Sequence, residues 1–297
     1  MLPKPQGLYD PQFEHDSCGV GFVANINGEK SHEIIRNGLQ IMVNLEHRGA
    51  VGADPLAGDG AGILMQLPHK LFSGVSSELG INLPAHDEYG VGMVFLPSDN
   101  QTRTELEAIV ERCITSEGQQ LLGWRDVPID NSMLSEDVKS TEPVIRQIFV
   151  GRGANVTDAD SFERKLFVIR KLVEATVSDS ALPDANDFYI CSLSARTIVY
   201  KGMLMGTQIV NYYVDLADER TTSALAIVHQ RFSTNTFPSW RLAHPYRMVC
   251  HNGEINTVRG NINAMTARKN SMKSELFGKD LEKLWPIVPE GRRRRGS

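Results

Sequence analysis

The chain has 297 residues, of which 41% are hydrophobic and 23% charged, and its formal net charge is -5. This is the composition of a globular protein, and its mild acidity gives no general attraction to nucleic acid or to an anionic membrane. No apolar stretch approaches the ~20 residues of a membrane helix. The polar opening MLPKPQGLYDPQFEHDS lacks the apolar segment of a signal peptide. The four cysteines are far apart in the sequence, which predicts reduced thiols and a cytoplasmic location.

Short apolar runs that predict strands alternate with segments whose apolar residues recur at helical spacing. In chain order these are a strand at CGVGFVAN (18–25), a helix from the N-cap Ser31 to about Glu46, strands at AGILMQL (61–67) and GVGMVFL (90–96), a helix over 106–114 that Gly118 ends, a helix over 162–173, and strands at FYICSLS (188–194), TIVYKG (197–202), IVNYYVD (209–215), ALAIVHQ (224–230) and YRMVCHN (246–252).

Two groups of strands with long helices between them indicate a layered α+β fold. FYICSLS and TIVYKG are separated by a connection too short for a parallel crossover, so the sheets are expected to be mainly antiparallel. No Pro/Ser-rich linker divides the chain, which favours one main domain.

Several common site motifs are excluded. Gly58, Gly60 and Gly62 in AGDGAGIL precede a strand, whereas a dinucleotide-binding loop joins a strand to a helix. The sequence contains no P-loop, no G-x-S-x-G and no C-x-x-C, and its histidines lack metal-ligand spacing, so no metal site is expected.

Cys18 stands at the start of the first apolar strand, directly after the polar leader. A buried packing residue is the ordinary role of a cysteine. The alternative is a nucleophile that removal of the leader exposes, because the free α-amine of a terminal cysteine can act as its base.

Two further motifs could complete such a site. In HNGEIN, the Asn252 amide and the Gly253 N–H are two donors that could bind one oxyanion, although Asn-Gly after an apolar run is also typical of a plain turn. Arg231 follows the strand ALAIVHQ and could bind a carboxylate through two hydrogen bonds, or could be an ordinary surface charge.

Taken together, these motifs resemble the amino-terminal glutaminase domain of the glutamate synthase large subunit, a class II glutamine amidotransferase of the N-terminal-nucleophile type. The resemblance extends from Cys18 to Gly291. It is carried by CGVGF, EHRGAVGADPLAGDGAGIL, GWRDVP (123–128), FYICSLS, YVDLAD (213–218), HQRFSTNTFPSW, HNGEINTVRGN and LWPIVPEG. GWRDVP and HNGEINT are more specific to glutamate synthases than to other amidotransferases.

The resemblance implies a role for each matching residue. Cys18 is the expected nucleophile, Asn252 and Gly253 the oxyanion donors, and Arg231 the ligand of the glutamine α-carboxylate. Arg48 is expected to order the surroundings of the thiol, with a structural ion pair as its alternative. The implied fold is a four-layer αββα sandwich, and the implied reaction hydrolyses L-glutamine to L-glutamate and ammonia through a Cys18 thioester.

The same resemblance predicts the organisation of the chain. Residues 1–17 are expected to be a removable leader, residues 18–291 the glutaminase domain, and residues 292–297 an arginine-rich tail that is a non-native or truncated end. Relatives have a substrate-binding aspartate at or next to the position of Arg294, so this chain is expected to bind glutamine poorly.

The remaining synthase domains are the expected partners of this domain. They would add the ammonia to 2-oxoglutarate, and FMN and an iron–sulfur cluster are implied there, with no cofactor in this chain. The alternatives are a weak or inert glutamine-binding fragment and the glutaminase half of another class II amidotransferase.

Overall fold

The computed structural model describes residues 4–7, 10, 19–49, 54–230, 237–251, 253 and 257–288, except the side chains of Arg48 and Val258. The strands are β1 (Val20–Ala24), β2 (Ala61–Gln66), β3 (Tyr89–Leu96), β4 (Gln120–Asp126), β5 (Val144–Gly151), β6 (Tyr189–Ser194), β7 (Thr197–Gly202) and β8 (Leu225–Gln230). The α-helices are α1 (His32–Asn44), α2 (His69–Glu78), α3 (Asn100–Ser116), α4 (Glu136–Ser140), α5 (Ala159–Asp179), α6 (Ile209–Tyr212) and α7 (Val258–Arg268). The 3₁₀ segments are η2 (Glu46–Arg48), η3 (Val214–Leu216), η4 (Trp240–Leu242), η5 (Lys269–Ser271) and η6 (Gly278–Leu284).

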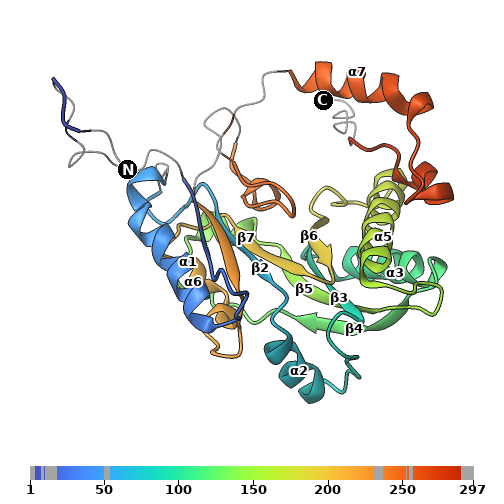
Figure 1. The fold of residues 1–297 in the computed structure, drawn as a ribbon, viewed down its shortest axis with the longest axis horizontal. Coiled ribbons are helices and arrows are strands. Elements are labelled where there is room, and N and C mark those ends of the chain that lie inside the picture. Colours follow the sequence, from blue (N-terminus) through green and yellow to red (C-terminus); the bar gives the residue numbers. More distant parts are fainter. Residues whose placement is uncertain are drawn as a thin grey trace.

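The strands form two four-stranded sheets, in the orders β1-β8-β2-β7 and β4-β5-β3-β6. All the strand pairings in both sheets are antiparallel, among the residues that the structure describes. Helix α1 packs against the first sheet, whereas α3 and α5 pack against the second (Figure 1). The α+β prediction with mainly antiparallel sheets is therefore confirmed, and helices flank the pair of sheets as an αββα arrangement requires.

The helices predicted from apolar spacing are present. Ser31 occupies the N-cap position of α1, although its side chain makes no capping hydrogen bond. A Cβ on Gly38 would lie 2.9 Å from the Cβ of Ala226, so this glycine lets α1 lie directly on β8. Gly118 has a φ of +72° just beyond the end of α3, the left-handed conformation that commonly ends a helix. No helix within the described ranges is both long and apolar enough to span a bilayer.

Two strand predictions are wrong. The segment IVNYYVD forms the helix α6 and the 3₁₀ turn η3, and the described part of YRMVCHN, residues 246–251, forms no strand. The apolar and aromatic residues of IVNYYVD are typical of a strand, but they pack in the core from a helical turn instead: Ile209, Tyr212 and Tyr213 are all fully buried. Tertiary packing overrides local propensity here.

Several further elements do not follow from the sequence pattern. Strands β4 and β5 and helix α2 were not predicted. Strands β6 and β7 are joined by a short link, as expected of a hairpin, yet they belong to different sheets. The short connection therefore passes from the second sheet to the first. Because it is short, β7 belongs to the first sheet but also contacts β6 and β3 of the second.

A buried polar network joins the two sheets. Arg125 of β4 donates two hydrogen bonds of 2.7 Å to the carboxylate of Asp215 in η3. Arg125 also donates to Gln147 of β5, and the hydroxyl of Tyr200 in β7 donates to Asp215 at 2.9 Å. Arg125 belongs to GWRDVP and Asp215 to YVDLAD, so the structure explains both motifs as parts of one buried network, which reaches the first sheet through Tyr200.

Candidate active site

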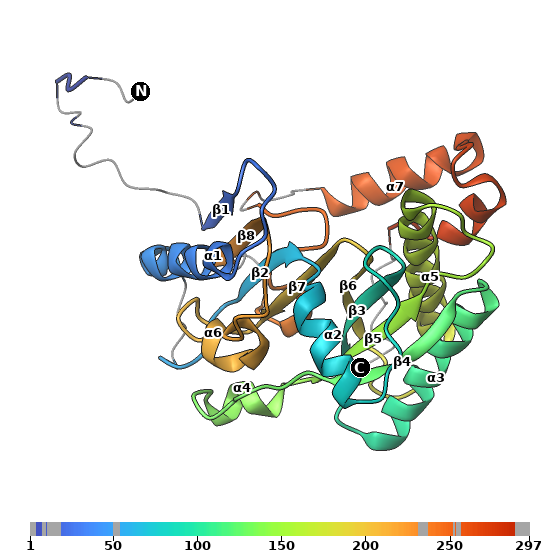
Figure 2. The ribbon, with the colours of Figure 1, turned by 60° about the horizontal axis from the view of Figure 1, so that its bottom comes forward.

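Four strand ends meet at one edge of the first sheet. The start of β1, the end of β8, the start of β2 and the end of β7 lie side by side, since Val20 pairs with His229 and Ala61 pairs with both Gln230 and Gly202. Figure 2 shows these strands in the order β1-β8-β2-β7, in which β1 is an outermost strand of the sheet. Every chain segment that enters or leaves the sheet at this edge is therefore brought close to the others.

Most of the sequence-predicted site residues fall outside the described residues. This holds for Cys18, Arg231 and Asn252, while Arg48 lies in η2 with its side chain not described. Their sequence neighbours are placed, however. Gly19, which follows Cys18 in the sequence, accepts a 2.8 Å hydrogen bond through its carbonyl from the N–H of Gln230, which precedes Arg231.

The side chain of Gln230 fills the space behind this edge. It is 3% exposed, and it lies between Gly49 and Gly206, since a Cβ on either glycine would overlap its amide. Its Oε1 has no hydrogen-bond partner within the described part of the chain. A cavity of about 20 Å³ beside it is lined by Glu46, Gly49, Gly58, Asp59, Gly60, Leu204, Met205 and Gln230, which is room for one water or one small polar group.

Gly253 is the oxyanion candidate that the structure describes. Its N–H donates a 2.9 Å hydrogen bond to Nδ1 of His251, so an incoming oxyanion must replace the imidazole as acceptor. The thiol of Cys250 donates to the carbonyl of Val228 in β8 at 3.7 Å. This contact places Cys250, three residues before Gly253, close to the end of β8.

Three histidine rings connect His251 to strand β8 of the first sheet. His244 packs against His229 of β8 with ring centroids 4.8 Å apart, and against His251 at 5.2 Å. Burial and the neighbouring histidines lower the pKa of His244 to about 3, so its ring is neutral. Within the described ranges, no three His, Cys, Asp or Glu side chains are grouped so that they could hold a metal ion. The rings of His229, His244 and His251 form a row of contacts from β8 to the acceptor of the Gly253 N–H.

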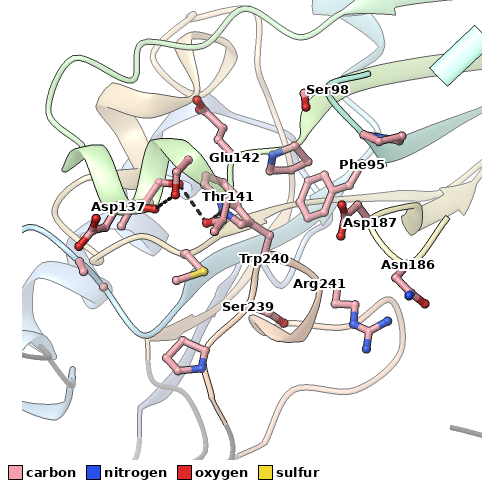
Figure 3. Close-up of a pocket in the computed structure, with 18 of the residues that line it drawn as sticks. Phe95, Ser98, Asp137, Thr141, Glu142, Asn186, Asp187, Ser239, Trp240 and Arg241 are labelled. Atoms are coloured by element: carbon pink, nitrogen blue, oxygen red, sulfur yellow. Dashed lines mark hydrogen bonds between the residues drawn. The ribbon is translucent and has the colours of Figure 1, made fainter. Parts of the chain in front are cut away.

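A larger cavity of about 710 Å³ adjoins the small one, with which it shares Gly58 and Asp59. Its wall includes Trp240 and Arg241 of η4 together with the carboxylates of Asp187, Asp137 and Glu142 (Figure 3). Burial and the nearby Asp184 raise the pKa of Asp187, while Arg241 opposes the rise. The site edge is therefore continuous with a larger cavity whose lining includes these three carboxylates.

The sequence analysis did not identify Gln230, His244 or His251 as site residues. Gln230 directly precedes the predicted Arg231, and His251 directly precedes the predicted Asn252. Their positions in the motifs HQR and HNG could therefore have indicated that they lie at the site. His244 carried no motif signal, and only the ring contacts place it at the site.

Comparison with known proteins agrees with this arrangement. Residues 18–293 match the family of class II glutamine amidotransferases. The chain is 48% identical to the glutamate synthase [NADPH] large chain of Bacillus subtilis over 288 residues, which cover 97% of this chain and 19% of that protein. It is 44% identical over 290 residues to the same protein of Azospirillum brasilense, covering 97% and 19% respectively.

A chloroplastic ferredoxin-dependent glutamate synthase of Oryza sativa is also similar, with 44% identity over 274 residues that cover 92% of this chain and 17% of that protein. The chain thus spans about a fifth of the length of these relatives and corresponds to their amino-terminal region. The family match covers nearly the whole chain and the fold has the layers that the resemblance implied. The chain belongs to the class II glutamine amidotransferases, as a glutaminase domain of the glutamate synthase type.

Proposed function

We propose that this chain hydrolyses L-glutamine to L-glutamate and ammonia, with Cys18 as the nucleophile. The observation that carries the proposal is the hydrogen bond between Gly19 and Gln230 at the sheet edge. It brings together the two residues that directly adjoin the proposed nucleophile and the proposed carboxylate ligand Arg231. The match to the family begins at Cys18, which supports removal of residues 1–17.

The reaction would proceed in two stages. The free α-amine of Cys18 takes the thiol proton, and the thiolate attacks the side-chain amide carbon of glutamine. The resulting oxyanion accepts hydrogen bonds from the Asn252 amide and from the Gly253 N–H. The Gly253 N–H gives up its hydrogen bond to Nδ1 of His251 in this step. Collapse of this intermediate expels ammonia, which carries the proton from the α-ammonium group, and water then hydrolyses the γ-glutamyl thioester.

The longer relatives are glutamate synthases. We therefore extend the proposal to delivery of the ammonia to further synthase domains. An iron–sulfur cluster takes several cysteine ligands, and the described residues do not fit one because Cys113 and Cys191 are buried in different core clusters. Any such cluster belongs to the further domains.

The test is glutamine hydrolysis by the purified chain, measured as ammonia release, together with the N-terminal sequence of the active form. Active protein should begin at Cys18, and Cys18→Ala and Cys18→Ser should lose both hydrolysis and labelling by an electrophilic glutamine analogue. The matched control is Cys191→Ala, since burial raises the pKa of the Cys191 thiol to about 12 and makes it unreactive. Hydrolysis by the Cys18→Ala protein, or active protein that begins at Met1, would refute the proposal.

A further inference from the structure

Lys201 is a fully buried cation outside the machinery described above. It lies near the end of β7, is 0% exposed, and forms no ion pair with any carboxylate among the described residues. Its ammonium donates hydrogen bonds to the backbone carbonyls of Arg241 at 2.8 Å and Ala243 at 2.7 Å. It also lies over the rings of Tyr189 and Tyr246, 4.7 and 4.4 Å from their centroids.

Such a group is costly in a core. Withdrawing an ammonium from water without a counter-charge disfavours its charged form, and burial accordingly lowers the pKa of Lys201 to about 8, with Arg170 acting in the same direction and Cys191 opposing it. The side chain is still charged at neutral pH. A methionine would fill similar space without this cost, so packing alone does not account for a lysine at this position.

The segment that Lys201 holds leads along the chain to His251 and Gly253. Residues 241–246 pass close to Gly62 of β2. A Cβ on Gly62 would overlap the carbonyl oxygen of His244, so the absence of a side chain at this position lets the segment pack against the sheet. The His244 ring, next in sequence to the Ala243 carbonyl, contacts the ring of His251. His251 in turn accepts the hydrogen bond from the Gly253 N–H.

We propose that Lys201 is a positioning residue for the Gly253 N–H, which it holds in place through the backbone of residues 241–243 and the rings of His244 and His251. This inference rests on the proposed glutaminase function. Lys201 touches no reacting atom. It acts by keeping the Gly253 N–H where the oxyanion forms, and a misplacement of about 1 Å at a reacting centre can cost about 10²-fold in rate.

The test compares Lys201→Met with the wild-type chain in glutamine hydrolysis. We expect kcat to fall about 10–100-fold with KM changed less than about threefold, because the oxyanion exists only in the transition state. Alkylation of Cys18 by iodoacetamide, which needs the thiolate but no oxyanion site, should keep its rate. A purely structural Lys201 would instead lower kcat and alkylation together, in proportion to the folded fraction.

Tyr213→Phe is the matched control, because the Tyr213 hydroxyl donates a 2.7 Å hydrogen bond to the backbone carbonyl of Lys201 and not to residues 241–243. It should lower the melting temperature while kcat stays within about twofold. Should Lys201→Met fail to fold, Lys201→Gln, whose side chain is one atom shorter and uncharged, takes its place with the same expected split between kcat and KM. A folded Lys201 variant with wild-type kcat overturns this inference alone, whereas hydrolysis by Cys18→Ala overturns the proposed function.

Discussion

Replacing Asp215 with alanine should destabilise the fold strongly, because this carboxylate forms a salt bridge with the buried guanidinium of Arg125. Both side chains are buried, with Arg125 7% and Asp215 3% exposed. The substitution removes two hydrogen bonds from the guanidinium at 2.7 Å and one from the Tyr200 hydroxyl at 2.9 Å. Arg125 would keep its bond to Gln147 alone.

The expected cost follows from leaving a charge buried without its partner. Breaking a buried ion pair from one side costs about 3–5 kcal/mol, which corresponds to a fall in melting temperature of about 6–20 °C for a domain of this size. Because the pair joins β4 to η3 and thereby links the two sheets, the loss should appear in the cooperative unfolding of the whole domain.

The assay is urea unfolding followed by circular dichroism, with the free energy of unfolding extrapolated to water. Asp218→Ala is the matched control, since Asp218 forms an ion pair with Arg220 whose side chains are 27% and 46% exposed, and exposed pairs contribute only about 0–1 kcal/mol. A loss below about 1 kcal/mol for Asp215→Ala, equal to that of the control, would show that Arg125 and Asp215 do not form a buried pair.

Three further outcomes are expected. Asn252→Ala should lower kcat for glutamine by ~10²–10³ through loss of one oxyanion donor, and a change confined to KM would make Asn252 a binding or turn residue. Burial raises the pKa values of Tyr200, Tyr212 and Tyr213 well above 10. The folded state then keeps protons that the unfolded state loses, so each tyrosine should cost about 1.4 kcal/mol of stability per pH unit above about pH 10, and urea midpoints that stay constant to about pH 11 would contradict this. The pKa of His244 is lowered to about 3, so the unfolded state binds a proton that the folded state does not between about pH 6.5 and 3. The free energy of unfolding should therefore decrease as the pH is lowered from about 6.5 to 3. The decrease should be less steep in His244→Phe, and equal slopes for the two proteins would argue against a buried, neutral His244.

The fold class, the family and the three long helices could be predicted from the amino-acid sequence alone. Apolar spacing identified α1, α3 and α5 because each presents one apolar face to a sheet, which is a local property of the chain. The order of many motifs identified the family, and six of the eight described strands stood out as apolar runs. The sequence motifs also named the proposed site residues, of which Gly253 is the one that the structure describes in full.

How these elements meet depends on contacts between residues that are distant in sequence. The pattern of IVNYYVD is typical of a strand, but Tyr212, Tyr213 and Asp215 have partners in three different segments, Glu142, the Lys201 carbonyl and Arg125, which a helical turn reaches together. The assignment of β6 and β7 to separate sheets and the convergence of four strand ends likewise depend on contacts distant in sequence. The role of Lys201 is of the same kind, because a lysine in an apolar strand shows its function only when the chain places two backbone carbonyls from forty residues away within hydrogen-bonding distance.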